Sequence, residues 1–295
     1  MRCGLLELVK FNLRSFLCSI GVAWFSLFFV FTLPVVVNAA QFGSEWQGET
    51  RSKVRLIAGE GRWLGKKTVV AGIEIQLAPH WKTYWRVPGD AGIPPNFDFS
   101  GSQNLKKVEV LYPVPRRYFE PSGLTIGYKK RVVFPVLLQP IDPGQPIELN
   151  LSAAFGICDD ICIPVEVMSQ LKVGDVSGSP FSSLLDISLQ TVPEPLKAAS
   201  MLGVQRVELV QGDVPHLTLL IKTEQPDLEI DLFIEGPGGL YVPMPKRIEG
   251  GEPDSLSAVF RVDLSDENLA DFQKAKLVCT MKIGDQAFVQ PCPVN

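Results

Sequence analysis

The chain has 295 residues, 46% of them hydrophobic and 20% charged, which is the composition of a globular protein and argues against bulk disorder. Its formal net charge of −4 excludes a protein that binds nucleic acid through a strongly basic surface. The 25 glycines and 24 prolines disfavour a helical bundle, and only two histidines argue against a multi-histidine metal centre.

The N-terminal segment has the pattern of an export signal. Basic residues lie within 1–15, an uncharged apolar run follows over 16–37, and small or apolar residues at 37–39 offer a cleavage site. We therefore expect a signal peptide over 1–39 and a mature chain outside the cytoplasm. Because the apolar run is long enough to span a bilayer, an uncleaved anchor that tethers the chain to the inner membrane is the alternative.

The first half of the mature chain has the pattern of short strands. Hydrophobic and polar residues alternate in several segments, as in strands that bury one face. These segments are 73–77, 147–151 and 165–173, with further candidates at 54–58, 107–111 and 131–138. Segments rich in Pro, Gly and Asp separate them, so the spacing predicts a β-sandwich over residues 40–175.

Residues 176–200 interrupt this pattern. Gly, Ser and Pro dominate 174–183, which is typical of a linker, and a short helical turn is expected at 193–195. We therefore predict a linker over 176–200.

Strand-like alternation returns in residues 201–295, which we expect to form a second, smaller β-rich domain that resembles a sandwich. Ser265 is expected to cap a short helix that ends before Lys276. Residues 276–283 and 286–290 are expected to pair as a hairpin around Gly284 and Asp285.

Four cysteines follow the export signal, and paired cysteines in an oxidising compartment form disulfides by default. On a straight strand the Cα atoms of Cys158 and Cys162 would lie about 13 Å apart. A disulfide requires Cα atoms within about 7 Å, so a bond between these cysteines requires a turn at Asp159 and Asp160.

The two cysteine pairs are expected to differ in role. A short bridge at a turn is expected to be exposed and labile, so Cys158 and Cys162 are the candidate redox couple. Cys279 and Cys292 are expected to form a structural disulfide that links the two sides of the C-terminal hairpin. For the first pair, an ordinary structural disulfide and a metal site remain alternatives, the latter weakened by the small number of ligands.

Three stretches resemble the N-terminal, periplasmic domain of the DsbD family of thiol:disulfide interchange proteins, and most closely its ScsB-type branch. They are HWKTYWRVPGDAGIPP at 80–95, GYKKRVVFPV at 127–136 and CDDICIPVE at 158–166. They follow the family's order over about residues 50–175, although fewer residues separate the two cysteines than in the best-known enterobacterial members. The resemblance implies an all-β, immunoglobulin-like sandwich whose cysteine pair relays electrons. The second half is only loosely similar to a further sandwich domain of the ScsB-type branch.

The resemblance also implies partners. The sequence contains neither the family's multi-helix membrane domain nor a thioredoxin-type C-x-x-C motif. An electron donor of DsbD, ScsB or CcdA type would therefore be supplied in trans, and oxidised periplasmic proteins would be the clients. We expect no soluble cofactor, no metal and no nucleic acid, and an activity of the protein-disulfide reductase type.

Two other functions remain open. The first is a non-catalytic periplasmic binding or assembly module in which both disulfides are structural. The second is copper binding, which the link of the ScsB-type branch to copper tolerance suggests.

The two aspartates between the redox cysteines are expected to shape the site. Negative charge close to a sulfur disfavours the thiolate, so Asp159 and Asp160 would limit the thiolate population at rest. By the resemblance, Cys162 would be the exposed sulfur. Nearby basic residues could compensate; they are Arg116, Arg117, Lys129, Lys130 and Arg131.

Aromatic residues are the other candidates at the site. Alternation along a strand places Tyr84 on the face opposite to Trp81 and Trp85. In the family an aromatic cap loop shields the cysteines, and Tyr128 is our candidate for the shielding residue. Tyr118 and Phe119 lie in or beside the turn-rich segment that could form this loop.

Overall fold

The computed structural model describes residues 41–295, apart from 91, 121–122, 198–199, 226–227 and 250–253. The expected signal peptide or anchor over 1–39 lies outside these residues. Within the described part of the chain, no helix is long and apolar enough to cross a membrane.

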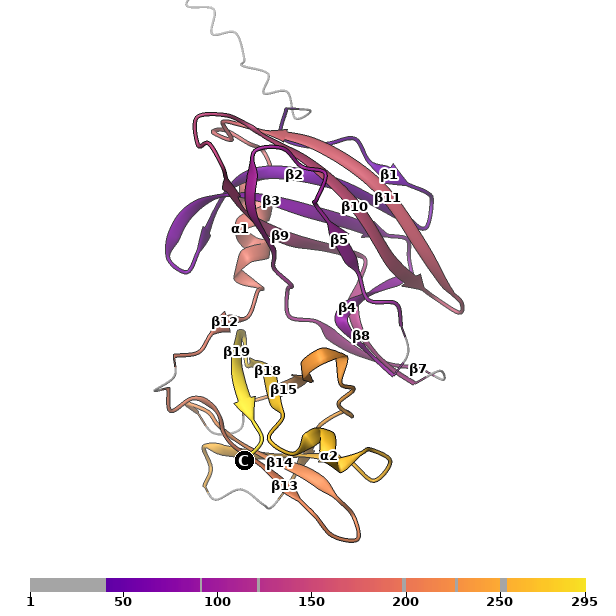
Figure 1. Cartoon of the computed structure of the whole chain (residues 1–295), viewed down its shortest axis with the longest axis vertical. Helices are drawn as coiled ribbons and strands as arrows, with labels where there is room; N and C mark the ends of the chain where they lie inside the picture. Colours follow the sequence, from indigo (N-terminus) through magenta and orange to yellow (C-terminus); the bar gives the residue numbers. More distant parts are fainter. Residues whose placement is uncertain (1–40, 91, 121–122, 198–199, 226–227, 250–253) are drawn as a thin grey trace, which may run out of the picture. The chain divides into compact units, whose positions relative to one another are not determined.

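The first half of the described chain is a sandwich of two antiparallel sheets (Figure 1). One sheet has the strand order β1 (Gln47–Gly48), β2 (Ser52–Trp63), β3 (Lys66–Leu77), β9 (Arg131–Pro140) and β6 (Leu105–Val110). The other has the order β11 (Cys162–Val173), β10 (Ile147–Cys158), β4 (Lys82–Gly89), β8 (Gly123–Lys129) and β7 (Arg116–Glu120), and β5 (Asn96–Asp98) also pairs with β10. The predicted immunoglobulin-like sandwich is therefore confirmed.

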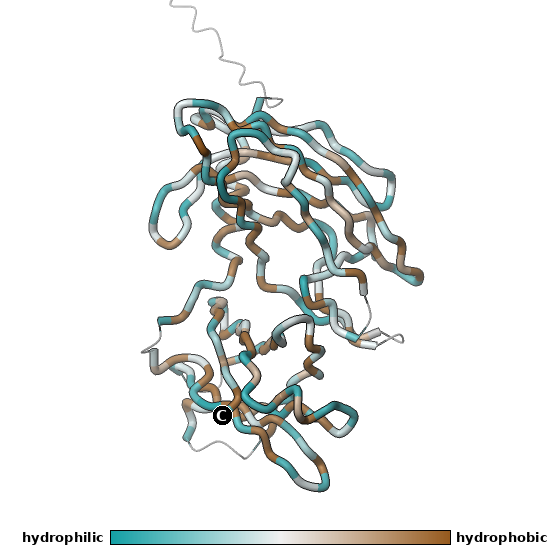
Figure 2. Tube along the Cα trace, viewed as in Figure 1, coloured by the Kyte–Doolittle hydropathy of each residue, from teal (hydrophilic) through white to brown (hydrophobic). Residues whose placement is uncertain are grey.

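The alternation in the sequence corresponds to one buried face on each sheet. Leu56 of β2 and Ile73 of β3 contribute to the core from one sheet, and Leu149 and Leu151 of β10 contribute from the other. Along the strands, hydrophobic and hydrophilic residues alternate, as the brown and teal segments of Figure 2 show. Burying such a side chain stabilises the fold by about 1.5–3 kcal/mol, which is why the pattern determines the strands.

The expected linker over 176–200 requires a correction, because it contains helix α1 (Ser182–Gln190) packed on the first sandwich. Leu185 and Leu189 lie four positions apart, share one helix face and are buried against the outer face of β2 and β3. Gly72 of β3 leaves room for them, since a Cβ there would lie 2.7 Å from Leu185 Cδ2. The polar composition of the preceding segment obscured this short apolar stripe. The domain boundary near residue 200 stays a prediction.

The helical turn expected at 193–195 is also wrong. Residues 194–195 form strand β12 (Glu194–Pro195), which pairs in parallel with the last strand of the chain. Proline is tolerated there because β12 lies at the edge of its sheet.

The second half contains two further four-stranded sheets around a separate core. One sheet comprises β13 (Gly203–Val210), β14 (His216–Lys222), β17 (Ser257–Asp263) and β16 (Lys246–Ile248). The other comprises β12, β19 (Gln286–Pro293), β18 (Lys276–Ile283) and β15 (Ile230–Glu235). The described residues of this half also include two short helical segments, η2 (Pro237–Gly239) and α2 (Leu269–Phe272).

The predicted C-terminal hairpin is confirmed, because β18 and β19 pair from Ile283 and Gln286 outward. The predicted helix exists but begins later than expected. Its N-cap is Asn268, whose side chain accepts a hydrogen bond from the Ala270 amide. Ser265 donates instead to the carboxylate of Asp263, which caps the preceding turn and not the helix.

Candidate functional site

The β10–β11 hairpin brings the two candidate redox cysteines together. Cys158 is the last residue of β10, Cys162 is the first residue of β11, and the antiparallel register pairs them directly. Asp159, Asp160 and Ile161 form the turn between them, and the Asp159 amide donates to the Ile161 carbonyl. The Cα atoms are 4.2 Å apart and the sulfurs are bonded, so the chain turns where the cysteine spacing requires it.

The two sulfurs of this disulfide have different surroundings. Cys158 is 6% exposed, because β10 lies between β11 and β4 within the sheet. Cys162 is exposed, because it starts β11, the strand at the edge of the same sheet. An incoming thiolate can therefore reach the Cys162 sulfur more readily than the Cys158 sulfur.

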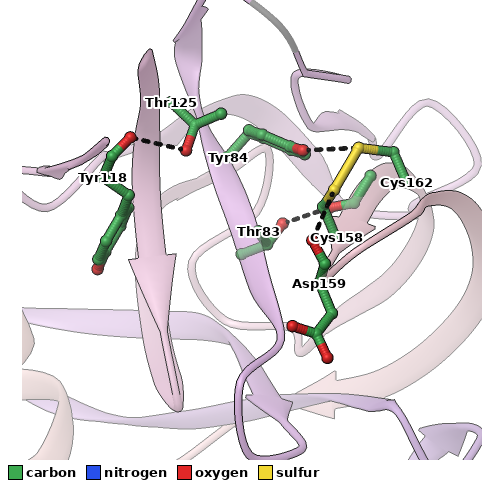
Figure 3. The surroundings of a disulfide bond; sticks show 8 residues. Thr83, Tyr84, Tyr118, Thr125, Cys158, Asp159 and Cys162 are labelled. Carbon is green, nitrogen blue, oxygen red and sulfur yellow. Dashed lines mark hydrogen bonds between the residues drawn. A yellow bond between two sulfur atoms is a disulfide. The ribbon is translucent and has the colours of Figure 1, made fainter. Parts of the chain in front are cut away.

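Strand β4 supplies a polar contact to the exposed sulfur. The hydroxyl of Tyr84 lies 3.2 Å from Cys162 Sγ, although Tyr84 itself is completely buried (Figure 3). The neighbouring Thr83 donates its hydroxyl to the carbonyl of Gly156, at 2.8 Å, and so ties β4 to β10 next to the disulfide. As alternation predicted, Trp85 points the other way into the core.

A loop that follows β4 covers the ring of Tyr84. At Gly92 the backbone has φ +153°, and a Cβ there would lie 2.5 Å from two ring carbons of Tyr84. The carbonyl of Ile93 accepts a hydrogen bond from the Gly156 amide, which fixes the loop to β10. Residues 87–95 are one of the segments rich in Pro, Gly and Asp that separate the predicted strands, but the sequence analysis missed that this segment covers the tyrosine. Its two glycines and three prolines were the available signal.

The expected aromatic shields lie elsewhere. The Tyr128 hydroxyl donates to the Pro113 carbonyl at 2.7 Å, and its ring packs edge-on against Phe134 in the core. Burial raises the pKa of Tyr128 well above its ordinary value, so this hydroxyl remains a donor. Phe119 is 77% exposed, so most of its ring faces solvent, and Figure 3 shows the ring of Tyr118 away from the disulfide. These positions favour Tyr84 over Tyr128 as the tyrosine that acts on a sulfur.

The aspartates of the turn and the basic residues expected to balance them differ in their surroundings. Asp159 and Asp160 are exposed in the turn, where solvent weakens their effect on the sulfurs. Among the basic candidates, Arg131 pairs with the buried Glu74 and Arg117 pairs with Asp231. Neither arginine is therefore available to balance the aspartates.

The second disulfide joins Cys279 of β18 to Cys292 of β19, with Cα atoms 5.9 Å apart. Both cysteines are buried in the core of the second half, at 0% and 2% exposure. No external thiolate can reach these sulfurs without local unfolding, which fits the predicted structural role. In the described part of the chain, no group of three or more potential metal-ligating side chains comes together.

Comparisons with known proteins agree with this geometry. Residues 54–173 match the family model "Thiol:disulfide interchange protein DsbD, N-terminal". This match supports a DsbD-family N-terminal domain over these residues. The crystal structure of the N-terminal periplasmic domain of ScsB from Proteus mirabilis is similar in fold, with a TM-score of 0.68 and 21% identity, over 86% of this chain and 99% of that chain. No curated protein matches this chain in sequence.

The segment that matches the family model contains the first disulfide and not the second. The family match ends at Val173, the last residue of β11, so it includes Cys158 and Cys162 but excludes Cys279 and Cys292. The match to this family supports a role in thiol–disulfide exchange.

Proposed function

We propose that this chain is a periplasmic thiol–disulfide exchange protein. Its Cys158–Cys162 couple accepts reducing equivalents from a membrane donor of DsbD, ScsB or CcdA type and delivers them to oxidised periplasmic proteins. The carrying observation is the asymmetry of the disulfide, with an exposed Cys162 sulfur next to a tyrosine hydroxyl and a buried Cys158 sulfur. In thiol–disulfide exchange, the sulfur that a partner attacks must be accessible, whereas the sulfur that leaves as a thiolate does not need to be.

In the first half of the cycle, this chain is reduced. A donor thiolate attacks Cys162 Sγ, the Cys158–Cys162 bond breaks, and its electron pair remains on Cys158 as a thiolate. The second thiolate of the donor then attacks the donor sulfur of this mixed disulfide. Cys162 leaves as a thiolate, and the donor becomes a disulfide. Two electrons have passed to this chain.

In the second half of the cycle, a client is reduced. The Cys162 thiolate attacks one sulfur of the client disulfide, and the other client sulfur leaves as a thiolate. The Cys158 thiolate then attacks Cys162 Sγ, reforms the original disulfide and releases the second client thiolate. The Tyr84 hydroxyl supports this cycle by donating to the Cys162 sulfur whenever that sulfur carries negative charge.

A redox titration of the two disulfides tests the exchange chemistry. The chain is equilibrated in glutathione buffers and quenched with acid, and mass spectrometry of alkylated peptides reports each pair separately. We expect Cys158–Cys162 to titrate near or above about −250 mV, in the range of exchange proteins, and Cys279–Cys292 to stay oxidised below about −300 mV. If both pairs resist reduction alike, the chain is better described as a binding module with two structural disulfides.

Trapping of mixed disulfides tests the relay. In a Cys158→Ser chain, Cys162 can attack a partner but no resolving thiol remains, so mixed disulfides with the donor and the clients should accumulate in cells. The matched Cys162→Ser chain keeps only the buried sulfur and should trap few partners. Equal trapping by the two variants would contradict the assignment of Cys162 as the attacking sulfur.

A further inference from the structure

Strand β4 also places a lysine directly opposite the buried sulfur. Lys82, the first residue of β4, pairs in register with Cys158 of β10 on one side and with Lys129 of β8 on the other. Residues that pair directly across antiparallel strands point to the same face, with Cβ atoms about 4.5–5.5 Å apart. The next row along the strands, Thr83 with Ile157, faces the opposite way, and Ile157 lies in the core.

The burial of Lys82 is unusual for its residue type. Its side chain is 1% exposed and is among the largest fully buried side chains of the chain. Lysine is almost never fully buried unless its charge is compensated, because removing an ammonium from water costs several kcal/mol. Because Lys82 pairs in register with Cys158, its side chain lies on the same face as the buried sulfur.

We propose that Lys82 is a positioning residue for the exchange reaction, in which its ammonium stabilises the thiolate form of Cys158. This inference rests on the proposed function. When a donor thiolate attacks Cys162, the electron pair of the broken bond remains on Cys158, and a sulfur with a lower pKa leaves faster. Lys82 and Tyr84, two positions apart on β4, would then serve the buried and the exposed sulfur respectively.

The electrostatic need for a cation is specific to Cys158. Burial alone raises the pKa of a thiol, because a low-dielectric environment disfavours the thiolate. An opposite charge within about 4–6 Å lowers the pKa by roughly one to three units, which is enough to offset burial. Among the described residues, the other titratable or charged groups that lie in the turn or share this face by register are Asp159, Asp160, Tyr84, Arg116, Tyr118, Lys129 and Glu166. Lys82 is the basic residue paired in register with the sulfur itself.

The test measures the thiol pKa of Cys158 in a Cys162→Ser chain, which retains Cys158 as the single thiol of the couple. The Cβ chemical shift of isotopically labelled cysteine is followed by NMR as a function of pH, which does not require access to the buried sulfur. We expect Lys82→Met to raise this pKa by about one unit or more, a tenfold loss of thiolate at any pH below the pKa. Lys82→Arg should restore most of the shift. Lys129→Met, which removes the exposed lysine of the same row, is the matched control and should change the pKa far less.

An unchanged pKa in a folded Lys82→Met chain would overturn the proposal, and so would an equal rise in Lys82→Arg and Lys82→Met. If Lys82→Met does not fold, Lys82→Gln, which keeps hydrogen-bonding capacity without charge, gives the same comparison. Because this pKa is measured without any exchange partner, its outcome is separate from that of the redox titration. If Lys82→Met raises the Cys158 thiol pKa as expected but the Cys158–Cys162 pair resists reduction, the proposed function is refuted and the role of Lys82 is not.

Discussion

Replacing Tyr84 with phenylalanine removes one hydroxyl and nothing else from the site. That hydroxyl lies 3.2 Å from Cys162 Sγ, and the ring that carries it is completely buried beneath the loop at Gly92. Phenylalanine fills the same volume, so the packing of β4 against the hairpin should persist. We therefore expect Tyr84→Phe to change the chemistry of Cys162 without disrupting the fold.

The expected size of this change follows from the strength of one hydrogen bond. A hydrogen bond to a charged group contributes about 1.5–3 kcal/mol, and one pKa unit corresponds to about 1.36 kcal/mol. Because Cys162 is exposed and water competes for its sulfur, the lower end of this range applies. The donor favours the thiolate, so its removal should raise the Cys162 thiol pKa by about one unit. At pH values where Cys162 is ionised in the reduced protein, the reduced form loses the same free energy, which lowers the potential of the couple by about 30 mV.

Alkylation kinetics can measure this shift. In a Cys158→Ser background, the rate of alkylation of Cys162 as a function of pH reports its thiol pKa, since the thiolate is the nucleophile. The matched control is Tyr128→Phe, which removes another buried hydroxyl, the one that donates to the Pro113 carbonyl. We expect this control to cost about 1 kcal/mol of stability and to leave the Cys162 profile unchanged.

Three results would refute this reasoning. The Tyr84→Phe profile could coincide with that of the parent, it could move to lower pH, or Tyr128→Phe could move the profile by the same amount. The third result would show that the Tyr84 hydroxyl has no specific effect on Cys162.

Converting the aspartates at 159–160 to asparagine should lower the thiol pKa of the reduced couple, by less than one unit because both side chains are exposed. A pH titration of the alkylation rate that shows no shift of this pKa, or a rise, would contradict the expectation. Gly92→Ala should destabilise the fold by about 1–3 kcal/mol, since its Cβ would collide with a buried ring. The control Gly212→Ala has a similar φ of +157° but open space around it, so thermal unfolding should show a clearly smaller loss. Replacing Cys279 and Cys292 with alanine should cost roughly 3 kcal/mol in denaturant unfolding, as expected for a loop of this length, while the potential of the other couple stays unchanged.

Much of the fold could be predicted from the sequence because strand patterns are local. The alternation at 147–151 and 165–173 marks strands β10 and β11, and the separation of Cys158 from Cys162 requires a turn between them if they bond. The candidate redox couple could also be predicted, because cysteine sulfurs are the groups that carry out thiol–disulfide exchange. Helix α1 was missed because its apolar stripe is only two turns long and follows a polar segment.

The contacts around the sulfurs were decided by tertiary structure alone. Alternation shows that Tyr84 and Trp85 point to opposite faces, but it does not show which face meets the disulfide. That depends on the order of strands in the sheet, which places β4 beside β10 and leaves β11 at the edge. Strand order makes Cys158 buried and Cys162 exposed, and pairing register sets Lys82 opposite Cys158. Both arise from contacts between residues far apart in the chain, which a local pattern does not encode.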